Sequence, residues 1–354
     1  MRRISIQCGL AGVLMIHPDV FLAPCCFSSK LESESRHTLR ASSGQVAGAL
    51  WRGILTAGIV LALGSRGTSL RAAEERTIPG LNLKLLKVEP GTFTMGRPPG
   101  IPPGAGVEAD ETPETRVTLT KAFWLGATET TVGQYRAFAE ATGYLTEPEK
   151  TGAGIWVWVD RNPSYQLQPG TSWKTPGKEV VTSDQHPVVG VSWADAQAFC
   201  TWLTERERKA GRLPAGQIYS LPTEAQWEYA CKAGTGANDT ANPNEFAWNL
   251  ANSEKMSHPV GQKKPNAWGF YDMIGNVWEI CQDCYGKFPG GNVTDFVGQP
   301  PANPAARVVR NIRGNSFSGG GVHNTSVTNR WGDIPNRDWR TTLGFRVALV
   351  ASGK

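Results

Sequence analysis

A fifteen-residue stretch at 265–279 constrains this chain more than any other part of it. The stretch holds two glycines, four aromatic residues and two carboxylates, and the acids Asp272 and Glu279 flank a Gly-Asn pair that is typical of a turn. In one interpretation, the turn leads into a strand that buries Val277 and leaves both acids in water. In the other, the two side chains and the carbonyls of Gly275 and Val277 form an oxygen cage of the kind that Ca²⁺ prefers, although the spacing matches no EF-hand loop.

Composition indicates a globular chain that is rich in loops. The 354 residues include 40 glycines, 24 prolines and 13 tryptophans, which is too little glycine and proline for disorder and enough tryptophan for a substantial core. The net charge of +5 arises before residue 74, where eight Lys and Arg face three Asp and Glu, and the remainder carries 28 of each sign. A balanced body has no electrostatic footprint for nucleic acid. We therefore expect a monomer that does not bind nucleic acid.

Residues 1–73 have the anatomy of an export leader. Arg52 precedes the mostly apolar run 53–63, which small residues follow and which is too short to span a bilayer. We expect a periplasmic or extracellular protein, with a membrane contact only through an uncleaved leader. Two alternatives stay open, because translation could begin near Val46 or Leu50, or the apolar run could be a signal anchor or a core helix.

Apolar periodicity and turn signals predict short strands and helices in no βαβ rhythm, which favours an α+β fold. Strands are expected at 85–88, 92–96, 116–119, 123–125, 188–191 and 344–349, with a turn at 89–91 joining the first two as a hairpin. Thr131, Ser192 and Thr223 are predicted to cap helices, the first of which ends at Gly143. The stretch 143–184 has no clear pattern, and such a length is either functional or wrongly interpreted.

Cysteines and histidines offer two metal or redox hypotheses. Cys281 and Cys284 form a CxxC pair, but no second soft-ligand pair accompanies them, so we interpret them as structural, with a disulfide as an option in an exported protein. A non-haem metal site could use the body's three histidines, His186, His258 and His323. The first two each precede Pro-Val, a context that favours packing over ligation. No GxSxG elbow, HExxH helix, Walker loop or dinucleotide fingerprint is present.

Seven segments, taken together, resemble the formylglycine-generating enzyme family, also called sulfatase-modifying factors. They run in the family's order from about Leu81 to Val350. They are Gly91–Gly96, Thr142–Glu147 with Glu149-Lys150, Ser172–Pro176, His186–Val188 with Val191–Trp193, Leu221–Ala230, Gly275–Glu279 and Gly344–Arg346. Each segment is weak alone, but jointly they are highly specific.

The resemblance implies one irregular α+β domain at 78–350, a variant of the C-type lectin fold with little regular secondary structure. It also implies structural calcium. The family's calcium loop falls on Asp272, Gly275, Val277 and Glu279, which favours the cage over the solvated turn.

The family's oxidases bind copper(I) through two cysteines and convert a sulfatase cysteine into formylglycine. Those cysteines fall at about Gly319 and Asn324, and no cysteine follows Cys284. Thiolates suit Cu(I) and oxygen ligands replace them poorly, so the resemblance does not extend to copper. The partners of Cys200 and Cys231 in the family's disulfides are also missing, which predicts two free buried thiols.

Ser316, Trp278 and Arg346 resemble residues around the family's pocket, and His323 lies beside a lost copper ligand. Three hypotheses follow. The first is an exported family member that is not a copper oxidase, such as an oxidoreductase acting on another protein, peptide or small molecule. The second is a noncatalytic lectin-like module that binds a glycan or peptide. The third is a sulfatase-activating oxidase with atypical ligands such as His323 and Cys284.

Overall fold

The computed structural model describes residues 74–98, 109–159, 164–177, 181–234, 242–303, 305–319, 326–333 and 339–352. The chain divides into two units, Met1–Gly67 and Thr68–Lys354, and every described residue belongs to the second. The predicted leader at 1–73 and His323 therefore lie outside the described residues. Among the helices of the described part, none has the length and apolar character needed to cross a membrane.

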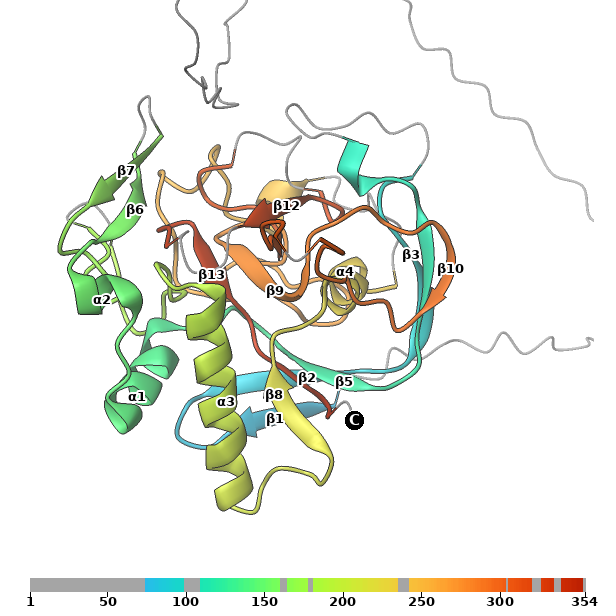
Figure 1. Cartoon of the computed structure of the whole chain (residues 1–354), viewed down its shortest axis with the longest axis horizontal. Coiled ribbons are helices and arrows are strands. Elements are labelled where there is room, and N and C mark those ends of the chain that lie inside the picture. Colours follow the sequence, from blue (N-terminus) through green and yellow to red (C-terminus); the bar gives the residue numbers. More distant parts are fainter. Residues whose placement is uncertain are drawn as a thin grey trace, which may run out of the picture. The chain divides into compact units, whose positions relative to one another are not determined.

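The described strands form four small sheets, so the fold is α+β as the sequence predicts (Figure 1). The first sheet has the order β1 (Glu75–Ile78), β2 (Leu83–Val88), β5 (Phe123–Gly126), β14 (Ala348–Ala351) and β8 (Gln217–Ser220). The second is β10 (Gly291–Thr294), β4 (Thr115–Leu119) and β3 (Gly91–Met95), and the third is β12 (Arg330–Asp333), β11 (Arg310–Arg313), β9 (Trp278–Cys284) and β13 (Leu343–Phe345). The fourth is the hairpin of β6 (Ile155–Trp158) and β7 (Tyr165–Gln168).

Capping boxes start the main helices where the sequence predicts them. Thr131 caps α1 (Val132–Thr142), Ser192 caps α3 (Trp193–Lys209) and Thr223 caps α4 (Glu224–Lys232), each with its side chain accepting the N3 amide. Helix α1 ends at Gly143, whose φ of 68° is the left-handed conformation that glycine adopts without strain. Short helices complete the set: α2 (Glu147–Thr151), η1 (Ala109–Glu111) and η2 (Pro243–Glu245).

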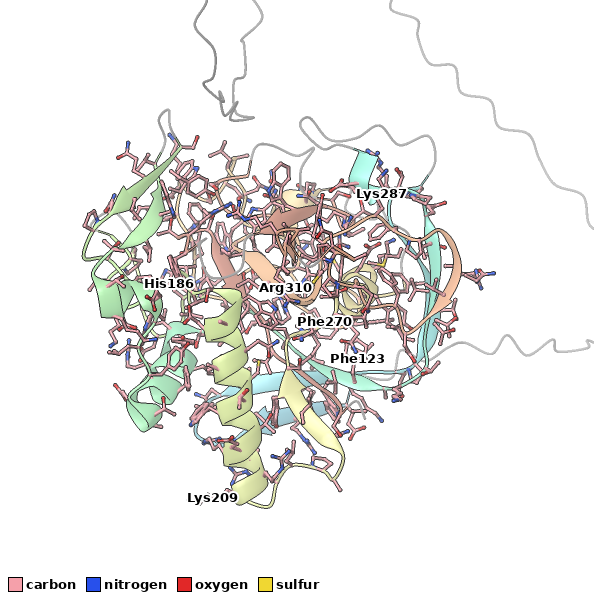
Figure 2. All side chains as sticks on the ribbon, viewed as in Figure 1. Phe123, His186, Lys209, Phe270, Lys287 and Arg310 are labelled. Atoms are coloured by element: carbon pink, nitrogen blue, oxygen red, sulfur yellow. The ribbon has the colours of Figure 1, made fainter. Side chains whose placement is uncertain are left out.

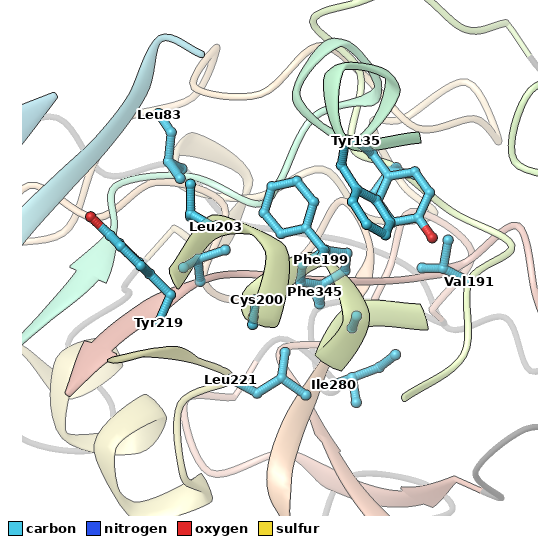
Figure 3. Packing of buried hydrophobic residues seen from close by; sticks show 14 of the residues in the cluster. Leu83, Tyr135, Val191, Phe199, Cys200, Leu203, Tyr219, Leu221, Ile280 and Phe345 are labelled. Carbon is cyan, nitrogen blue, oxygen red and sulfur yellow. The ribbon is translucent and has the colours of Figure 1, made fainter. Parts of the chain in front are cut away.

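Two hydrophobic clusters form the core. In the first, the faces of α1 and α3 meet through aromatic rings, and Phe199 stacks on Tyr135 at 6.0 Å and meets Phe345 edge-on at 5.6 Å (Figure 3). The second cluster contains Phe123 and Phe270 (Figure 2). Outside both clusters, Lys209 is exposed at the C-terminal end of α3. Both clusters include side chains of β9 and β14. The second also contains Phe270 and Met273, so the 265–279 stretch is packed into the core.

Two strand predictions are wrong. Strands β2 and β3 are not a hairpin, because β2 pairs with β1 and β5 while β3 pairs with β4 in another sheet. The chain changes sheet at Gly91, where a Cβ would lie 2.1 Å from the Tyr229 hydroxyl of α4. Residues 188–191 form no strand either, since Gly190 has a φ of 70° and the amides of Val188 and Gly190 bond to the loop carbonyls of Thr130 and Arg340.

Two further segments differ in part from the prediction. The expected final strand is divided into β13 and β14 by Arg346 and Val347. The stretch 143–184, which has no clear pattern in the sequence, contains α2 and the β6–β7 hairpin. The sequence did not predict these strands because each is only four residues long, which is too short for a clear alternation of apolar and polar residues.

Candidate functional site

The loop at 272–279 is a tight turn that leads directly into β9. Asp272 and Asn276 both have left-handed backbones, with φ of 60° and 64°. The Asn276 side chain holds the turn, since its Oδ1 accepts from the His258 amide at 2.9 Å and its Nδ2 donates to the His258 carbonyl at 3.2 Å. The predicted turn is confirmed, but the interpretation with both acids in water is wrong, because Asp272 and Glu279 are each 1% exposed.

Glu279 is paired with Arg346. The Nε and Nη2 atoms of Arg346 donate to Oε2 and Oε1 of Glu279 at 2.8 and 2.6 Å, and the Trp227 indole donates to Oε2 at 2.8 Å. The remaining Arg346 donors bond to the carbonyls of Gly126 and Tyr271. Glu279, predicted as a calcium ligand, and Arg346, predicted as a pocket residue, therefore form one buried ion pair.

A third carboxylate, Glu129, lies beside this pair, and no motif in the sequence indicated it. Its oxygens accept only long bonds, 3.2 Å from Asn276 Nδ2 and 3.4 Å from the Val277 amide, and the residue is 0% exposed. Burial, followed by the charges of Asp272 and Glu279, raises the pKa of Glu129 well above its ordinary value. We call Glu129, Asp272 and Glu279 the acidic cluster. Arg346 is the cation paired within it.

The acidic cluster has three carboxylates for one guanidinium, and one of its carboxylate oxygens has no hydrogen-bond partner. Asp272 Oδ2 accepts from the Gly261 amide at 2.7 Å, whereas Oδ1 is buried without a partner. Burial is also the main cause that raises the pKa of Asp272 to about 6. Charges buried in this way need a counter-ion or a proton.

The chemistry of these donors fits a hard cation. Asp272 Oδ1 is unsatisfied, the ligands are all oxygens, and Glu279 Oε1 accepts one hydrogen bond and keeps a lone pair, whereas Oε2 accepts two. In the described part of the chain, no three His, Cys, Asp or Glu side chains converge as a metal site. A calcium ion at this loop would therefore be held by Asp272 and Glu279 together with the carbonyls of Gly275 and Val277, and not by a ring of carboxylates.

The predicted pocket residues do not share one environment. Ser316 is 0% exposed, and its Oγ hydrogen-bonds to Ser318 Oγ at 3.0 Å. Trp278 is half-buried, and its amide donates to the Thr342 carbonyl at 2.8 Å. A bond of 2.7 Å from the Phe317 amide to the Asn276 carbonyl links the Ser316 turn to the loop that carries Trp278. Arg346, the third predicted pocket residue, is 0% exposed and lies in the acidic cluster, away from Ser316 and Trp278.

Aromatic side chains from distant segments gather around the Ser316 turn. Trp158 meets Phe317 edge-on at 5.7 Å, and the Tyr165 hydroxyl bonds to Thr342 Oγ1 at 2.8 Å. Trp156, directly before them on β6, is 37% exposed. We call Trp156, Trp158 and Tyr165 the aromatic surface; the Trp278 side chain packs against the first hydrophobic cluster instead.

The four cysteines of the described body are all buried and free. This confirms the prediction for Cys200 and Cys231. Burial raises the pKa of Cys231 to about 12 and also raises the pKa values of Cys200 and Cys281. Thiols with raised pKa values are poor nucleophiles and poor metal ligands. The CxxC pair lies within β9, and both of its thiols are free.

At Gly319, where the family's first copper cysteine would fall, a Cβ would lie 1.8 Å from Asn315 Oδ1. Asn315 precedes Ser316 at this turn, and its φ of 71° is the left-handed conformation that asparagine tolerates. The space that a cysteine side chain would need is filled by an amide.

A second buried charge cluster was missed from the sequence. It comprises Glu224, Glu228, Lys232, Arg313 and Arg330, which we call the matched cluster because each carboxylate faces a cation. Arg330 binds both oxygens of Glu224 at 2.7 and 2.9 Å, and Lys232 Nζ lies 2.7 Å from Glu228 Oε1. Arg313 donates to Glu228 and to the carbonyls of Thr328 and Asn329. The Glu228–Lys232 spacing of four residues on α4 was the available signal.

Comparison with known proteins agrees with this geometry. The family model described as Sulfatase-modifying factor enzyme 1-like domain matches residues 73–351. The formylglycine-generating enzyme of Mus musculus is 29% identical over 269 residues, covering 62% of this chain and 65% of that protein, slightly under two thirds of its length. The enzyme of Thermomonospora curvata is also 29% identical over 269 residues, covering 66% of this chain and 82% of that protein.

Other relatives carry different names. The mouse protein named Inactive C-alpha-formylglycine-generating enzyme 2 is 28% identical over 296 residues, covering 74% of this chain and 84% of that protein. Among solved structures, PvdO from Pseudomonas aeruginosa gives a TM-score of 0.60 at 24% identity and covers 79% of this chain and 98% of its own. Treponema denticola variable protein 1 gives 0.55 at 23% identity, with coverage of 78% and 99%. At these identities, the two structures show the fold of this chain and not its function.

The fold is the irregular α+β architecture of formylglycine-generating enzymes, a variant of the C-type lectin fold. The chain belongs to the formylglycine-generating enzyme, or sulfatase-modifying factor, family.

Proposed function

We propose that this protein is an exported family member that does not make formylglycine with copper and that binds a protein or peptide segment on its aromatic surface. The observation that carries the first part is that Gly319 supplies no thiol at this turn and that the Asn315 amide occupies the space beside it. Copper(I) needs soft ligands, and the thiols of the described body are buried in the core with no partner at that turn.

Identity to relatives does not decide between activity and inactivity. The chain is 29% identical to the active-named mouse enzyme and 28% identical to the mouse protein whose name calls it inactive. Residues at the site must therefore carry the argument.

The aromatic surface supports binding of an extended segment. Its tryptophans and tyrosine offer large, rigid contact area at low entropic cost. Among the described strands, β7 pairs with β6, and we propose strand addition to this hairpin as the binding mode. Trp156 and Leu167 are cross-strand partners on this hairpin and are 37% and 44% exposed, which gives an incoming segment an apolar contact.

The test of the copper claim is incubation of the purified protein with copper, oxygen and a Cys-x-Pro-x-Arg peptide. We expect no aldehyde by mass spectrometry, and a stoichiometric aldehyde product would refute the proposal. Metal analysis of protein purified without added metals separates the alternatives. Tight copper or iron would favour an oxidoreductase or an atypical sulfatase-activating oxidase, whereas calcium alone favours binding.

Binding itself is tested with peptide and glycan libraries. We expect peptide binding that weakens about tenfold on Trp156→Ala, the scale of a lost aromatic anchor, and that is unchanged by the exposed control Glu205→Gln. Binding to glycans alone on this surface would favour the lectin-like alternative. Export predicts a mature N-terminus near residue 73, and N-terminal sequencing of the native protein checks it.

A further inference from the structure

A third extended segment joins the β6–β7 hairpin and brings a charged residue to it. The Trp156 amide donates to the Trp339 carbonyl at 2.7 Å, and the Thr341 amide donates to the Trp156 carbonyl at 3.0 Å. Trp156 and Arg340 are therefore partners in a parallel β-bridge. Because partners in a bridge project to the same side of the sheet, Arg340 lies on the face of the hairpin that carries Trp156.

This face of the hairpin is the aromatic surface. Side chains alternate along a strand, so Trp158, two residues after Trp156, shares its face, and Tyr165 is the cross-strand partner of Trp158. The opposite face of β6 is turned into the core, since Ile155 is 0% exposed. Arg340 and the three aromatic side chains therefore belong to one face, although they come from three segments of the chain.

The Arg340 guanidinium is held over the Tyr165 ring. Its Cζ lies 5.5 Å from the ring centre, within the range of a cation–π contact. The ring itself is fixed, because the Tyr165 hydroxyl hydrogen-bonds to Thr342 Oγ1 at 2.8 Å. The face of this ring thus positions the cation and is not a platform for a ligand. A guanidinium has five N–H donors in its plane, and stacking on a ring uses none of them.

Arg340 is the one charged residue in the described segments that build this face and its surroundings, which are 155–159, 164–168, 315–319 and 339–343. The surface therefore combines apolar contact area with a single positive charge. A nucleic acid needs several cations along its backbone. A neutral segment would remove water from the guanidinium without supplying a charge in return. A carboxylate does supply it, and arginine can bind that group with two parallel hydrogen bonds.

From this placement we infer that the aromatic surface selects a peptide segment that carries an acidic side chain, with Arg340 as the residue that sets this specificity. The inference rests on the proposed function, because it names the class of segment that the same surface binds. Apolar neighbours of the acidic residue would contact Trp156, the bridge partner of Arg340. A basic side chain at the same place would meet a like charge, which lowers the affinity.

Three pools of short biotinylated peptides test the inference by biolayer interferometry with the full chain. All peptides have acetylated and amidated ends and vary among uncharged residues, and the pools differ in one central residue, which is Glu, Gln or Arg. We expect the Glu pool to bind about fivefold more tightly than the Gln pool, the upper range for a partly exposed ion pair, and the Arg pool to bind most weakly. The Gln pool is the internal reference, because a loss of fold would lower the binding of all pools together.

Variants at position 340 separate charge from packing. Arg340→Gln should reduce the ratio of Glu-pool to Gln-pool affinity to about one, and Arg340→Glu should invert the preference so that the Arg pool binds best. The exposed control Arg208→Gln on α3 should keep the wild-type preference. A further Gln pool with a free carboxyl end tests whether a chain terminus supplies the carboxylate in place of a side chain.

Three results would overturn the inference: the Glu, Gln and Arg pools bind the wild-type protein equally, the Glu preference survives in Arg340→Gln, or only the pool with a free carboxyl end binds. Peptide binding that Trp156→Ala weakens but that is independent of the central charge would uphold the proposed function and refute this inference. If none of the pools binds, both are wrong.

Discussion

The two buried charge clusters of this domain both combine carboxylates with arginine, and they differ in their balance of charge. In the matched cluster every carboxylate has its own cation, and Arg330 and Lys232 hold Glu224 and Glu228 directly. In the acidic cluster three carboxylates surround one guanidinium, and Asp272 Oδ1 has no partner. The matched cluster holds three cations for two carboxylates and leaves the buried donor Arg313 Nε without a hydrogen-bond partner, whereas the acidic cluster needs a proton or a cation.

The largest test removes the central arginine of each cluster. We expect Arg313→Met to lower the free energy of unfolding by about 3–5 kcal/mol, the usual result of breaking a buried pair. Arg346→Met should cost more, because the acidic cluster holds no second buried cation close to Glu279, while Glu228 keeps Lys232. Urea denaturation measures both, with exposed Arg208→Met as the control. Equal losses, or a larger loss in Arg313→Met, would contradict the comparison.

The second test concerns Asp283, at the margin of the matched cluster. Its Oδ1 accepts from the Glu224 amide at 2.7 Å and its Oδ2 from the Gly298 amide at 3.0 Å. Burial and the nearby charge of Glu224 raise its pKa to about 7, from 3.8 when exposed. The folded state therefore keeps this proton at higher pH than the unfolded state does. The resulting stability is present below pH 4 and is lost as the pH rises through 7.

We expect this loss to reach at most about 4 kcal/mol, at 1.36 kcal/mol for each pKa unit. Asp283→Asn should flatten the pH dependence of the free energy of unfolding between pH 4 and 7, measured by urea denaturation at half-unit steps. The exposed Asp184→Asn is the matched control. An unchanged slope in Asp283→Asn would show that Asp283 has its ordinary pKa.

The third test supplies the cation that the acidic cluster lacks. We propose structural calcium there, and calcium at a hundredfold excess over its Kd should raise the free energy of unfolding by about 2.7 kcal/mol. The increment should disappear with chelator and in Asp272→Ala, and it should persist in Glu205→Gln. If neither calcium nor chelator changes the melting temperature of the wild-type protein, the calcium proposal is wrong. Protonation of the carboxylates would then neutralise the buried charge of this cluster.

The smallest test concerns the helix that carries the matched cluster. Thr223 is the N-cap of α4, whose first residue is Glu224, and its Oγ1 accepts from the Gln226 amide at 3.2 Å. Thr223→Ala should cost about 1 kcal/mol, as lost N-caps do, and should leave the calcium increment unchanged. Thr223→Ser, which keeps the cap, is the control. A loss above about 3 kcal/mol would mean that the cap also aligns the charge pairs.

Local signals in the chain predicted local structure well. The capping boxes at Thr131, Ser192 and Thr223 start helices as expected, because a cap depends on four consecutive residues. The turn before β9 and the free thiols of Cys200 and Cys231 were also predicted correctly. Strand partners were harder, since a short strand carries no record of which neighbour it pairs with.

The site was only partly predictable. The sequence pointed to Asp272, Glu279 and Arg346, but the pairing of Glu279 with Arg346 joins positions separated by 67 residues. Glu129 enters the acidic cluster from 148 residues before Val277, and Arg313 reaches Glu228 across 85. The predicted roles of Ser316 and Trp278 remain predictions, as does that of His323.

The sequence by itself determined the family, the three capped helices and the absence of thiols after Cys284, because each is written in residues that are adjacent or present in the chain. Only the tertiary structure decided which buried charges are paired and that Asn315 fills the space beside Gly319. Burial and hydrogen bonding between distant segments set the energy of a charge, and neither property exists until the chain has folded.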